Sequence, residues 1–184
     1  FGFGAYAEYI CLAEESEDGV VAIKPANMTF EEAAVIPSGG ITTLGIVKLA
    51  DIQPGQKVLI YGASGSIGTM AIQLARHAGA EVTAVCSTHN LALVRSIGAD
   101  HAIDYTQEDF TQNGQIYDVI FDTVGKTSVL PTKKSLKENG SYPLATFGLP
   151  MLLQLLWFSK VGNQNFEFGT LKEKTEDLIF LKEL

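Results

Sequence analysis

The pattern of apolar and polar positions divides the chain at about residue 57. Beyond that point, short apolar runs alternate with segments in which apolar residues recur at helical spacing. The run 58–61 is apolar throughout, as a parallel strand covered on both faces requires. We expect strands at residues 58–61, 82–86, 101–105, 118–124, 141–147 and 165–168.

The helices predicted between these strands have recognisable ends. Apolar residues recur at helical spacing from Ile67 to Ala78, and Gly79 follows as a stop. Further helices are expected at about 90–97 and 128–138, each followed by a glycine. This alternation implies right-handed crossovers and an α/β fold, a doubly wound parallel Rossmann sheet of about six strands.

The first 56 residues have a different pattern. Apolar runs at 5–12 and 20–23 predict two short strands separated by an acidic loop. Thr29, with Glu32 three residues later, forms a capping box that predicts the start of a helix. We expect this helix to be broken at 37–40 by proline and glycine and to resume up to residue 49.

Composition limits the classes of partner. The 184 residues are 46% hydrophobic and 18% charged, which fits one α/β domain or one domain with a fragment of another. The net charge of −8 disfavours a nucleic-acid partner.

Residues 139–159 carry no charge, but Pro143, Gly148 and Pro150 interrupt them. We interpret them as a strand, a turn and a buried helix, and expect no membrane partner.

The cysteines bear on metal binding and location, and the chain ends bear on completeness. Cys11 and Cys86 lie 75 positions apart, and neither has a second Cys or a His at zinc-ligand spacing. We therefore expect no metal site and, by default, the reducing cytoplasm. The chain begins without Met and ends within an amphipathic helical pattern, from which we expect a truncated chain.

A glycine-rich turn joins the strand ending at Tyr61 to the helix that follows. Such a turn lets the backbone approach a pyrophosphate, whose charge the amides and dipole of the helix N-terminus favour. The first glycine of the G-x-G-x-x-G fingerprint is an alanine here. The candidate phosphate-binding residues are Gly62, Ala63, Ser64, Gly65, Ser66, Ile67 and Gly68. A tight turn that binds no ligand remains the alternative.

The end of the second predicted strand bears on the choice of cofactor. An NAD site usually has an Asp or Glu there, which binds the ribose 2′-hydroxyl. Residues 86–90 contain no acidic side chain, whereas hydroxyls and an imidazole can donate to a 2′-phosphate. We predict NADP(H) rather than NAD(H), with Ser87, His89 and Tyr105 as contacts. His89 fits an ordinary exposed loop histidine equally well.

Four segments, 5–12, 33–43, 62–68 and 118–125, occur in the order typical of one family. Together they resemble the medium-chain dehydrogenase/reductase superfamily, in its zinc-independent branch of zeta-crystallin-like NADPH:quinone and enone reductases. The resemblance implies that residues 1–27 are the tail of a GroES-like β domain that binds substrate. Residues 28–184 would then be the Rossmann NAD(P)-binding domain, truncated at its C-terminal end.

Two related classes of dehydrogenase are disfavoured. Ser38 stands where the zinc-dependent alcohol dehydrogenases of this superfamily place a ligand cysteine, and a serine hydroxyl is a poor zinc ligand. The short-chain dehydrogenases need a tyrosine followed four residues later by a lysine. None of the six tyrosines has a lysine at that spacing.

The resemblance also implies an activity. NADPH would deliver hydride to a quinone or to the β-carbon of an α,β-unsaturated carbonyl. Thr42 would contact the nicotinamide, flanked at the carboxyl ends of strands by Val124, Gly125, Phe147 and Gly148. No residue presents itself as a general acid, so no catalytic residue is assigned, and the fragment alone is expected to be inactive. The last strand would pair with its copy in a homodimer.

Two other functions stay open. The chain fits a non-catalytic NADP(H)-binding sensor or structural protein equally well, because such a protein shares the fold and the cofactor site. A zinc-type alcohol dehydrogenase is the third hypothesis. Oxidation of NADPH in the presence of a quinone or an enone separates the first two, and metal analysis of the full-length protein decides the third.

Overall fold

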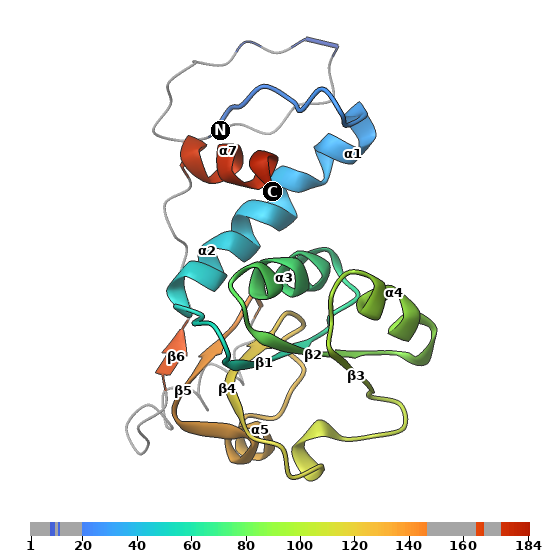
Figure 1. Ribbon diagram of the computed structural model, residues 1–184, viewed down its shortest axis with the longest axis vertical. Helices are drawn as coiled ribbons and strands as arrows, with labels where there is room; N and C mark the ends of the chain where they lie inside the picture. The colour runs from blue at the N-terminus through green and yellow to red at the C-terminus, as the bar shows by residue number, and fades with distance from the viewer. Residues whose placement is uncertain (1–7, 10, 12–19, 147–164, 168–173) are drawn as a thin grey trace.

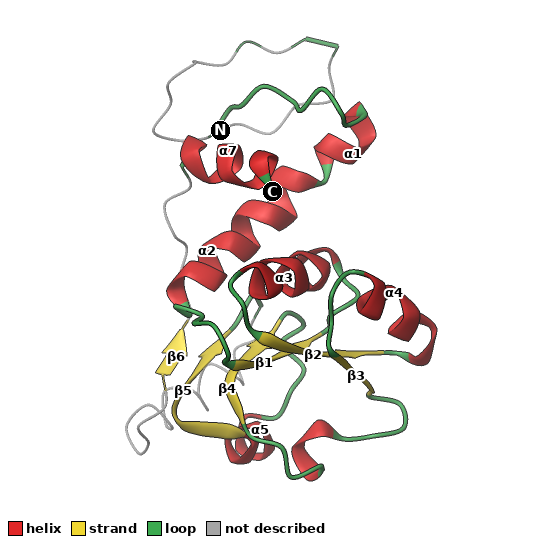
Figure 2. Ribbon diagram, in the orientation of Figure 1, coloured by secondary structure: helices red, strands yellow, loops and turns green. Residues whose placement is uncertain are grey.

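The computed structural model describes residues 8–9, 11, 20–146, 165–167 and 174–184. Its centre is a six-stranded sheet in the order β3-β2-β1-β4-β5-β6, in which every neighbouring pair is parallel (Figures 1 and 2). The strands are β1 Lys57–Tyr61, β2 Glu81–Cys86, β3 His101–Asp104, β4 Tyr117–Asp122, β5 Leu136–Pro143 and β6 Asn165–Glu167. The predicted doubly wound parallel sheet is confirmed.

Helices cover both faces of this sheet (Figure 1). The helices α3 Ser66–His77 and α4 Leu91–Ser96 lie on one face, and α5 Val129–Ser135 lies on the other. The short helices η2 Thr88–Asn90 and η3 Phe110–Gln112 lie in the connections. The strand order reverses between β1 and β4, and open α/β sheets bind ligands at such a switch point, beyond the carboxyl ends of the strands.

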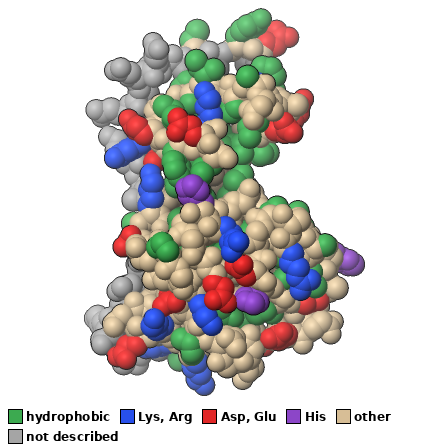
Figure 3. Space-filling model, in the orientation of Figure 1, with side chains coloured by type: hydrophobic (Ala, Val, Ile, Leu, Met, Phe, Trp, Pro, Cys, Tyr) green, Lys and Arg blue, Asp and Glu red, His purple; other side chains and the backbone are tan. Residues whose placement is uncertain are grey.

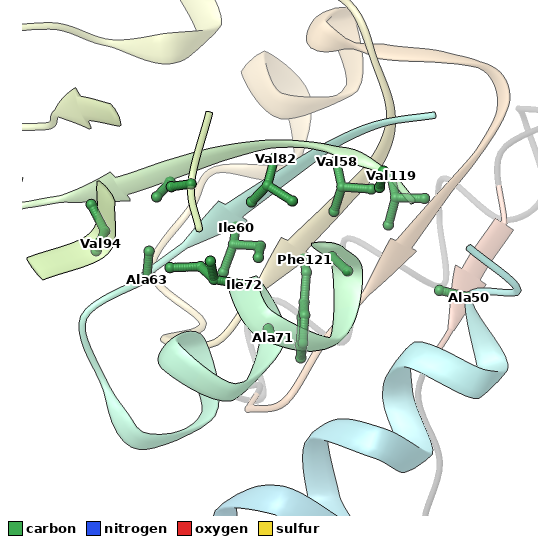
Figure 4. Close-up of a cluster of buried hydrophobic side chains, with 14 of the residues drawn as sticks. Ala50, Val58, Ile60, Ala63, Ala71, Ile72, Val82, Val94, Val119 and Phe121 are labelled. Atoms are coloured by element: carbon green, nitrogen blue, oxygen red, sulfur yellow. The ribbon is translucent and has the colours of Figure 1, made fainter. Parts of the chain in front are cut away.

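Both faces of the central strands are buried. Val58 and Ile60 of β1 belong to the cluster beneath α3, with Ile72 of that helix (Figure 4). Leu59, between them, belongs to the cluster on the opposite face together with Ile120. All five side chains are no more than 1% exposed. Burial on both faces explains why these strands are apolar throughout rather than alternating.

The boundary between α5 and β5 differs from the prediction. The helix ends at Ser135 rather than near residue 138, and the strand begins at Leu136 rather than at 141. Leu136 is 5% exposed and packs in the second core cluster, so burial of this side chain overrides the helical pattern. The pairing with β4 shifts register between Tyr117 and Val119, which accommodates the added residues.

The predicted helix break at 37–40 is wrong. The chain runs from α1 Phe30–Ala34 through a π-helical turn, η1 Pro37–Ile41, into α2 Thr42–Leu49, and the capping box before α1 is confirmed. The buried glycines of η1 allow close packing instead. A Cβ at Gly39 would lie 2.5 Å from the Ser66 Oγ, and one at Gly40 would lie 2.8 Å from a Leu181 methyl carbon.

The strands predicted before α1 are not found in the described residues. Residues 20–25 form no strand, and the 5–12 prediction lies mostly outside the described residues. The C-terminal helix α7 Thr175–Glu183 packs beside η1 and α2 (Figure 1). Its Asp177 pairs with Lys48 of α2, and Phe180 meets the His77 ring edge-on at 6.0 Å.

The described surface is mixed in charge. On the face seen in Figure 3, acidic and basic side chains are interspersed over the sheet domain, while hydrophobic side chains gather over the helices at the opposite end. Among the described residues, no helix has both the length and the apolar character that crossing a bilayer requires.

Candidate functional site

The turn between β1 and α3 is held by backbone hydrogen bonds. The amides of Gly62 and Ala63 both donate to the carbonyl of Val85 in β2, at 3.1 and 3.0 Å, and the Gly65 amide donates to the Gly62 carbonyl. The left-handed conformation falls on Gly62, with a φ of +79°. Ala63 is fully buried in the core beneath α3. An alanine is therefore tolerated in place of the first fingerprint glycine.

The N-terminus of α3 carries unpaired donors. Gly65 is the N-cap and supplies no side-chain bond, and the first helical amide bond is the one from Thr69 to the Gly65 carbonyl, at 2.9 Å. In the described part of the chain, no acceptor faces the amides of Ser66, Ile67 and Gly68. These three donors, with the positive end of the helix dipole, make the turn suitable for an anion.

The last fingerprint glycine brings α3 close to the turn. A Cβ on Gly68 would lie 2.6 Å from the Ala63 Cα, a distance that real side chains do not reach. Gly65 differs, because its Cβ would meet only the Gly62 carbonyl oxygen, at 3.5 Å. Gly68 is therefore required for packing, whereas Gly65 leaves space on the outer side of the turn.

A cavity of about 690 Å³ opens beside this turn, at the carboxyl ends of the strands. Eight predicted site residues line it: Gly62, Ser64, Gly65, Ser66, Ile67, Ser87, Tyr105 and Val124. Ala63 and Gly68 are buried behind the turn. Thr42, His89 and Gly125 do not line the cavity, and Phe147 and Gly148 lie outside the described residues.

Four further lining residues were not predicted from the sequence, namely Tyr61, Cys86, Thr123 and Lys126. All four immediately precede or follow a predicted site residue, so widening each predicted segment by one residue would have found them. Lys126 is found in this way because it follows Gly125. Lys126 is the only charged residue among the described residues that line the cavity.

The turn after β4 is fixed by the buried carboxylate of Asp122. This carboxylate accepts the amides of Val124 and Gly125, both at 2.8 Å, and the hydroxyl of Thr127 at 2.5 Å. The Thr123 hydroxyl donates to the Tyr61 carbonyl at 2.9 Å, which ties the same turn to the end of β1. The two loops that flank the cavity therefore hold each other in place.

Two titratable side chains in the cavity wall, Tyr61 and Cys86, are uncharged at neutral pH. Burial, and then the charge of Asp122, raises the pKa of the Tyr61 phenol. Burial, and then the charge of Asp104, raises the pKa of the Cys86 thiol. The Tyr61 ring packs against the rings of Tyr105 and Phe110, with centroids 6.5 and 5.9 Å apart. Apart from Lys126, the lining presents hydroxyls, amides and apolar groups.

The end of β2 carries the predicted cofactor contacts. Asn90 donates to the hydroxyl oxygens of Ser87 and Ser64, at 3.1 and 3.2 Å, so that both hydroxyl protons remain available to a ligand. Asp104, at the end of β3, is a nearby carboxylate that the sequence analysis did not consider. A hydrogen bond from the Thr88 hydroxyl, at 2.5 Å, is the main cause that lowers its pKa. Asp104 does not line the cavity.

The possible metal ligands are dispersed over the described residues. Within residues 20–146 and the shorter described stretches, no three side chains of His, Cys, Asp or Glu come together as a group able to hold a metal ion. Ser38, at the position compared with a zinc ligand, is exposed in η1.

Known reductases are similar to this chain in sequence and in structure. A 2-methylene-furan-3-one reductase of Solanum lycopersicum is 38% identical over 146 residues, covering 78% of this chain and 36% of the reductase. An NADPH-dependent alkenal/one oxidoreductase, chloroplastic, of Arabidopsis thaliana is 38% identical over 141 residues, covering 75% of this chain and 35% of that enzyme. A quinone oxidoreductase structure from Coxiella burnetii matches with a TM-score of 0.76 and 29% identity, covering 88% of this chain and 51% of its own.

The chain thus spans about a third of the length of these two curated relatives. The sequence profile of a family described as zinc-binding dehydrogenase matches residues 66–164, more than half of the chain. This match agrees with the parallel sheet, with the glycine turn after β1 and with the cavity beside that turn. The chain belongs to this dehydrogenase family and, with it, to the quinone and enone oxidoreductase branch of the medium-chain dehydrogenase/reductase superfamily.

Proposed function

We propose that this chain is the NADP(H)-binding part of an oxidoreductase that reduces a quinone or an α,β-unsaturated carbonyl. The observation that carries the proposal is the row of amides at the start of α3, which have no partner among the described residues and open on a cavity of about 690 Å³. The Arabidopsis relative is NADPH-dependent by name, and the relatives' names include enone and quinone substrates. Nothing observed favours a non-catalytic sensor.

The residues of the cavity fit a dinucleotide. The amides of Ser66 and Ile67 donate to the pyrophosphate, and the bare backbone of Gly65 allows its approach. Val124, on the turn fixed by Asp122, limits the cavity beside the phosphate turn. When bound, NADPH supplies the hydride. The chain's own residues bind and orient it, and the apolar part of the lining excludes water.

Selectivity for NADP(H) rests on the lack of a carboxylate among the described lining residues, together with the Ser87 hydroxyl at the end of β2. A Ser87→Asp variant places a negative charge where the 2′-phosphate lies. Calorimetric titration of the full-length protein should therefore give tighter binding of NADPH than of NADH, and the variant should reverse this order. Ser96→Asp, on the exposed side of α4, adds the same charge away from the cavity and serves as the control.

The titration has a clear negative outcome. Equal binding of NADPH and NADH by the wild type would refute the specificity. If the full-length protein binds NADPH but does not oxidise it with any quinone or enone offered, the protein is a sensor rather than a reductase. Steady-state loss of NADPH absorbance measures this turnover.

Several further properties belong to the same proposal. We propose that residues 1–27 are part of the substrate domain and that residues 28–184 form the nucleotide domain.

We propose that hydride transfer needs no zinc, in keeping with Ser38, and metal analysis of the active protein would test this. The free cysteines are consistent with a cytoplasmic location, which cell fractionation would test.

The oligomeric state is proposed from the sheet. β6 is paired on one side to β5, and no described strand pairs with its other side, which would therefore be available to a second copy in a homodimer. A proline in place of Phe166 removes one backbone donor from this strand. Sedimentation analysis should find the wild type dimeric and the variant shifted towards monomer. A monomeric wild type would refute the dimer.

A further inference from the structure

Lys126 occupies a distinct place in the fold. It lies in the turn after β4 and lines two adjoining cavities, the one of about 690 Å³ beside the phosphate turn and another of about 340 Å³. Tyr61 and Tyr105 are shared by the same two cavities. The second cavity includes no residue of α3, so Lys126 lies on the side of the site that extends away from the helix N-terminus.

The backbone around Lys126 is fixed while its side chain is free. The residues before and after it, Gly125 and Thr127, donate their amides to the Asp122 carboxylate, at 2.8 and 3.3 Å. Lys126 itself is exposed, and the four ion pairs found in the described part of the chain use other cations. A rigid turn therefore presents to the first cavity an ammonium that has no ion-pair partner among the described residues. The second cavity also contains the carboxylates of Glu108 and Asp109, which favour an orientation of the phosphate towards the first cavity.

The charge balance of the cavity shows what this ammonium can do. The described lining of the first cavity includes no other charged residue, and the donor at the end of β2 is the neutral hydroxyl of Ser87. A phosphate monoester carries nearly two negative charges at neutral pH and binds most strongly to a cationic donor. His89, whose imidazole was predicted to contact the 2′-phosphate, does not line the cavity.

We propose that Lys126 determines specificity for NADP(H), its ammonium serving as the counter-charge to the 2′-phosphate. The inference rests on the proposed function, since it assigns a residue to the same cofactor. The 2′-phosphate is favoured over the pyrophosphate for two reasons. The amides of α3 already serve the pyrophosphate, and Lys126 shares both of its cavities with Tyr105, which follows β3 on the adenosine side of the site.

Titration of the full-length protein with NADPH and with NADH tests this assignment. Lys126→Met removes the charge and keeps the length of the side chain, so the Kd for NADPH should rise about tenfold while the Kd for NADH stays the same. Lys126→Arg keeps the charge and should retain the preference. Lys134→Met, on the exposed side of α5 and outside both cavities, removes the same charge and should change neither Kd.

The salt dependence gives a second readout. The affinity of the wild type for NADPH should fall as ionic strength rises, and this dependence should be weaker in Lys126→Met. An equal loss of affinity for both nucleotides would mean that Lys126 contacts a part that NADPH and NADH share. That result would overturn the assignment, as would an unchanged preference for NADPH. A wild type that binds neither nucleotide would overturn the proposed function as well.

Discussion

Replacing Gly68 by alanine tests the packing of the phosphate turn. The new Cβ would lie 2.6 Å from the Ala63 Cα and 2.7 Å from its carbonyl carbon, whereas ordinary contact begins at 3.4 Å. These are backbone atoms, so no side chain can rotate away, and the helix or the turn must move by the better part of an ångström. Because Ala63 is fully buried in the core, that movement disturbs packed strands.

Overpacking of this kind costs about 2 kcal/mol of unfolding free energy, which corresponds to a fall of roughly 6 °C in Tm for a domain of this size. Gly65→Ala is the matched control. Its backbone has a φ of −79° and a ψ of 172°, which alanine adopts freely, and its Cβ would only touch the Gly62 carbonyl oxygen. That Cβ would occupy the outer side of the turn, where the pyrophosphate binds.

The two variants should therefore separate stability from binding. Thermal unfolding followed by circular dichroism should show a lowered Tm for Gly68→Ala and a nearly unchanged Tm for Gly65→Ala. Titration with NADPH should show that Gly65→Ala loses affinity by about tenfold or more, equivalent to about 1.4 kcal/mol. Equal melting temperatures in the two variants would refute the packing argument, and full NADPH affinity in Gly65→Ala would refute the assignment of the turn.

Three more outcomes are expected. Burial opposes ionisation of Asp118, but hydrogen bonds from Lys137 and a backbone amide outweigh it and lower its pKa. Its stabilising effect is therefore present above about pH 4 and lost as the pH falls, so urea unfolding should find Asp118→Asn less stable by about 0.5 kcal/mol at pH 7 and equal to wild type near pH 3. Asp122→Ala leaves several part-buried donors without their acceptor and should cost about 3 kcal/mol in the same assay; a cost below about 1 kcal/mol would contradict the anchoring role. Gly40→Ala should destabilise α7 against η1, and a second change, Leu181→Ala, should recover part of that loss; strictly additive effects would show that the two do not touch.

The sheet could be predicted well because its central strands have a pattern that can be recognised in the sequence alone. A strand buried on both faces must be apolar throughout, and Val58 and Ile60 show this directly. The boundary of β5 was missed because Leu136 sits among polar residues, and its burial depends on Ile120 and other residues distant in sequence. The π-helical turn was read as a break because Pro37 and the glycines after it signal interruption locally, whereas close packing against other helices keeps the chain helical.

The candidate site was predictable where it follows a turn motif. The segment from Gly62 to Ile67 lines the cavity apart from the buried Ala63, and the same glycine spacing that suggested it is explained by the close approach of α3. Lys126 follows the predicted residue Gly125, but its role could not be found in this way, because a single exposed lysine has no pattern. Its place depends on the Asp122 carboxylate and on which strands are neighbours, and neither can be read from residue spacing.

The parallel sheet has a practical consequence for labelling. Because all six strands point the same way, the loops that enter the strands lie at the edge away from the cavity. Gln115 is exposed in the loop that leads into β4 and does not line the cavity. A fluorophore inserted there would report on unfolding without obstructing the nucleotide, which gives binding and stability experiments a common optical signal.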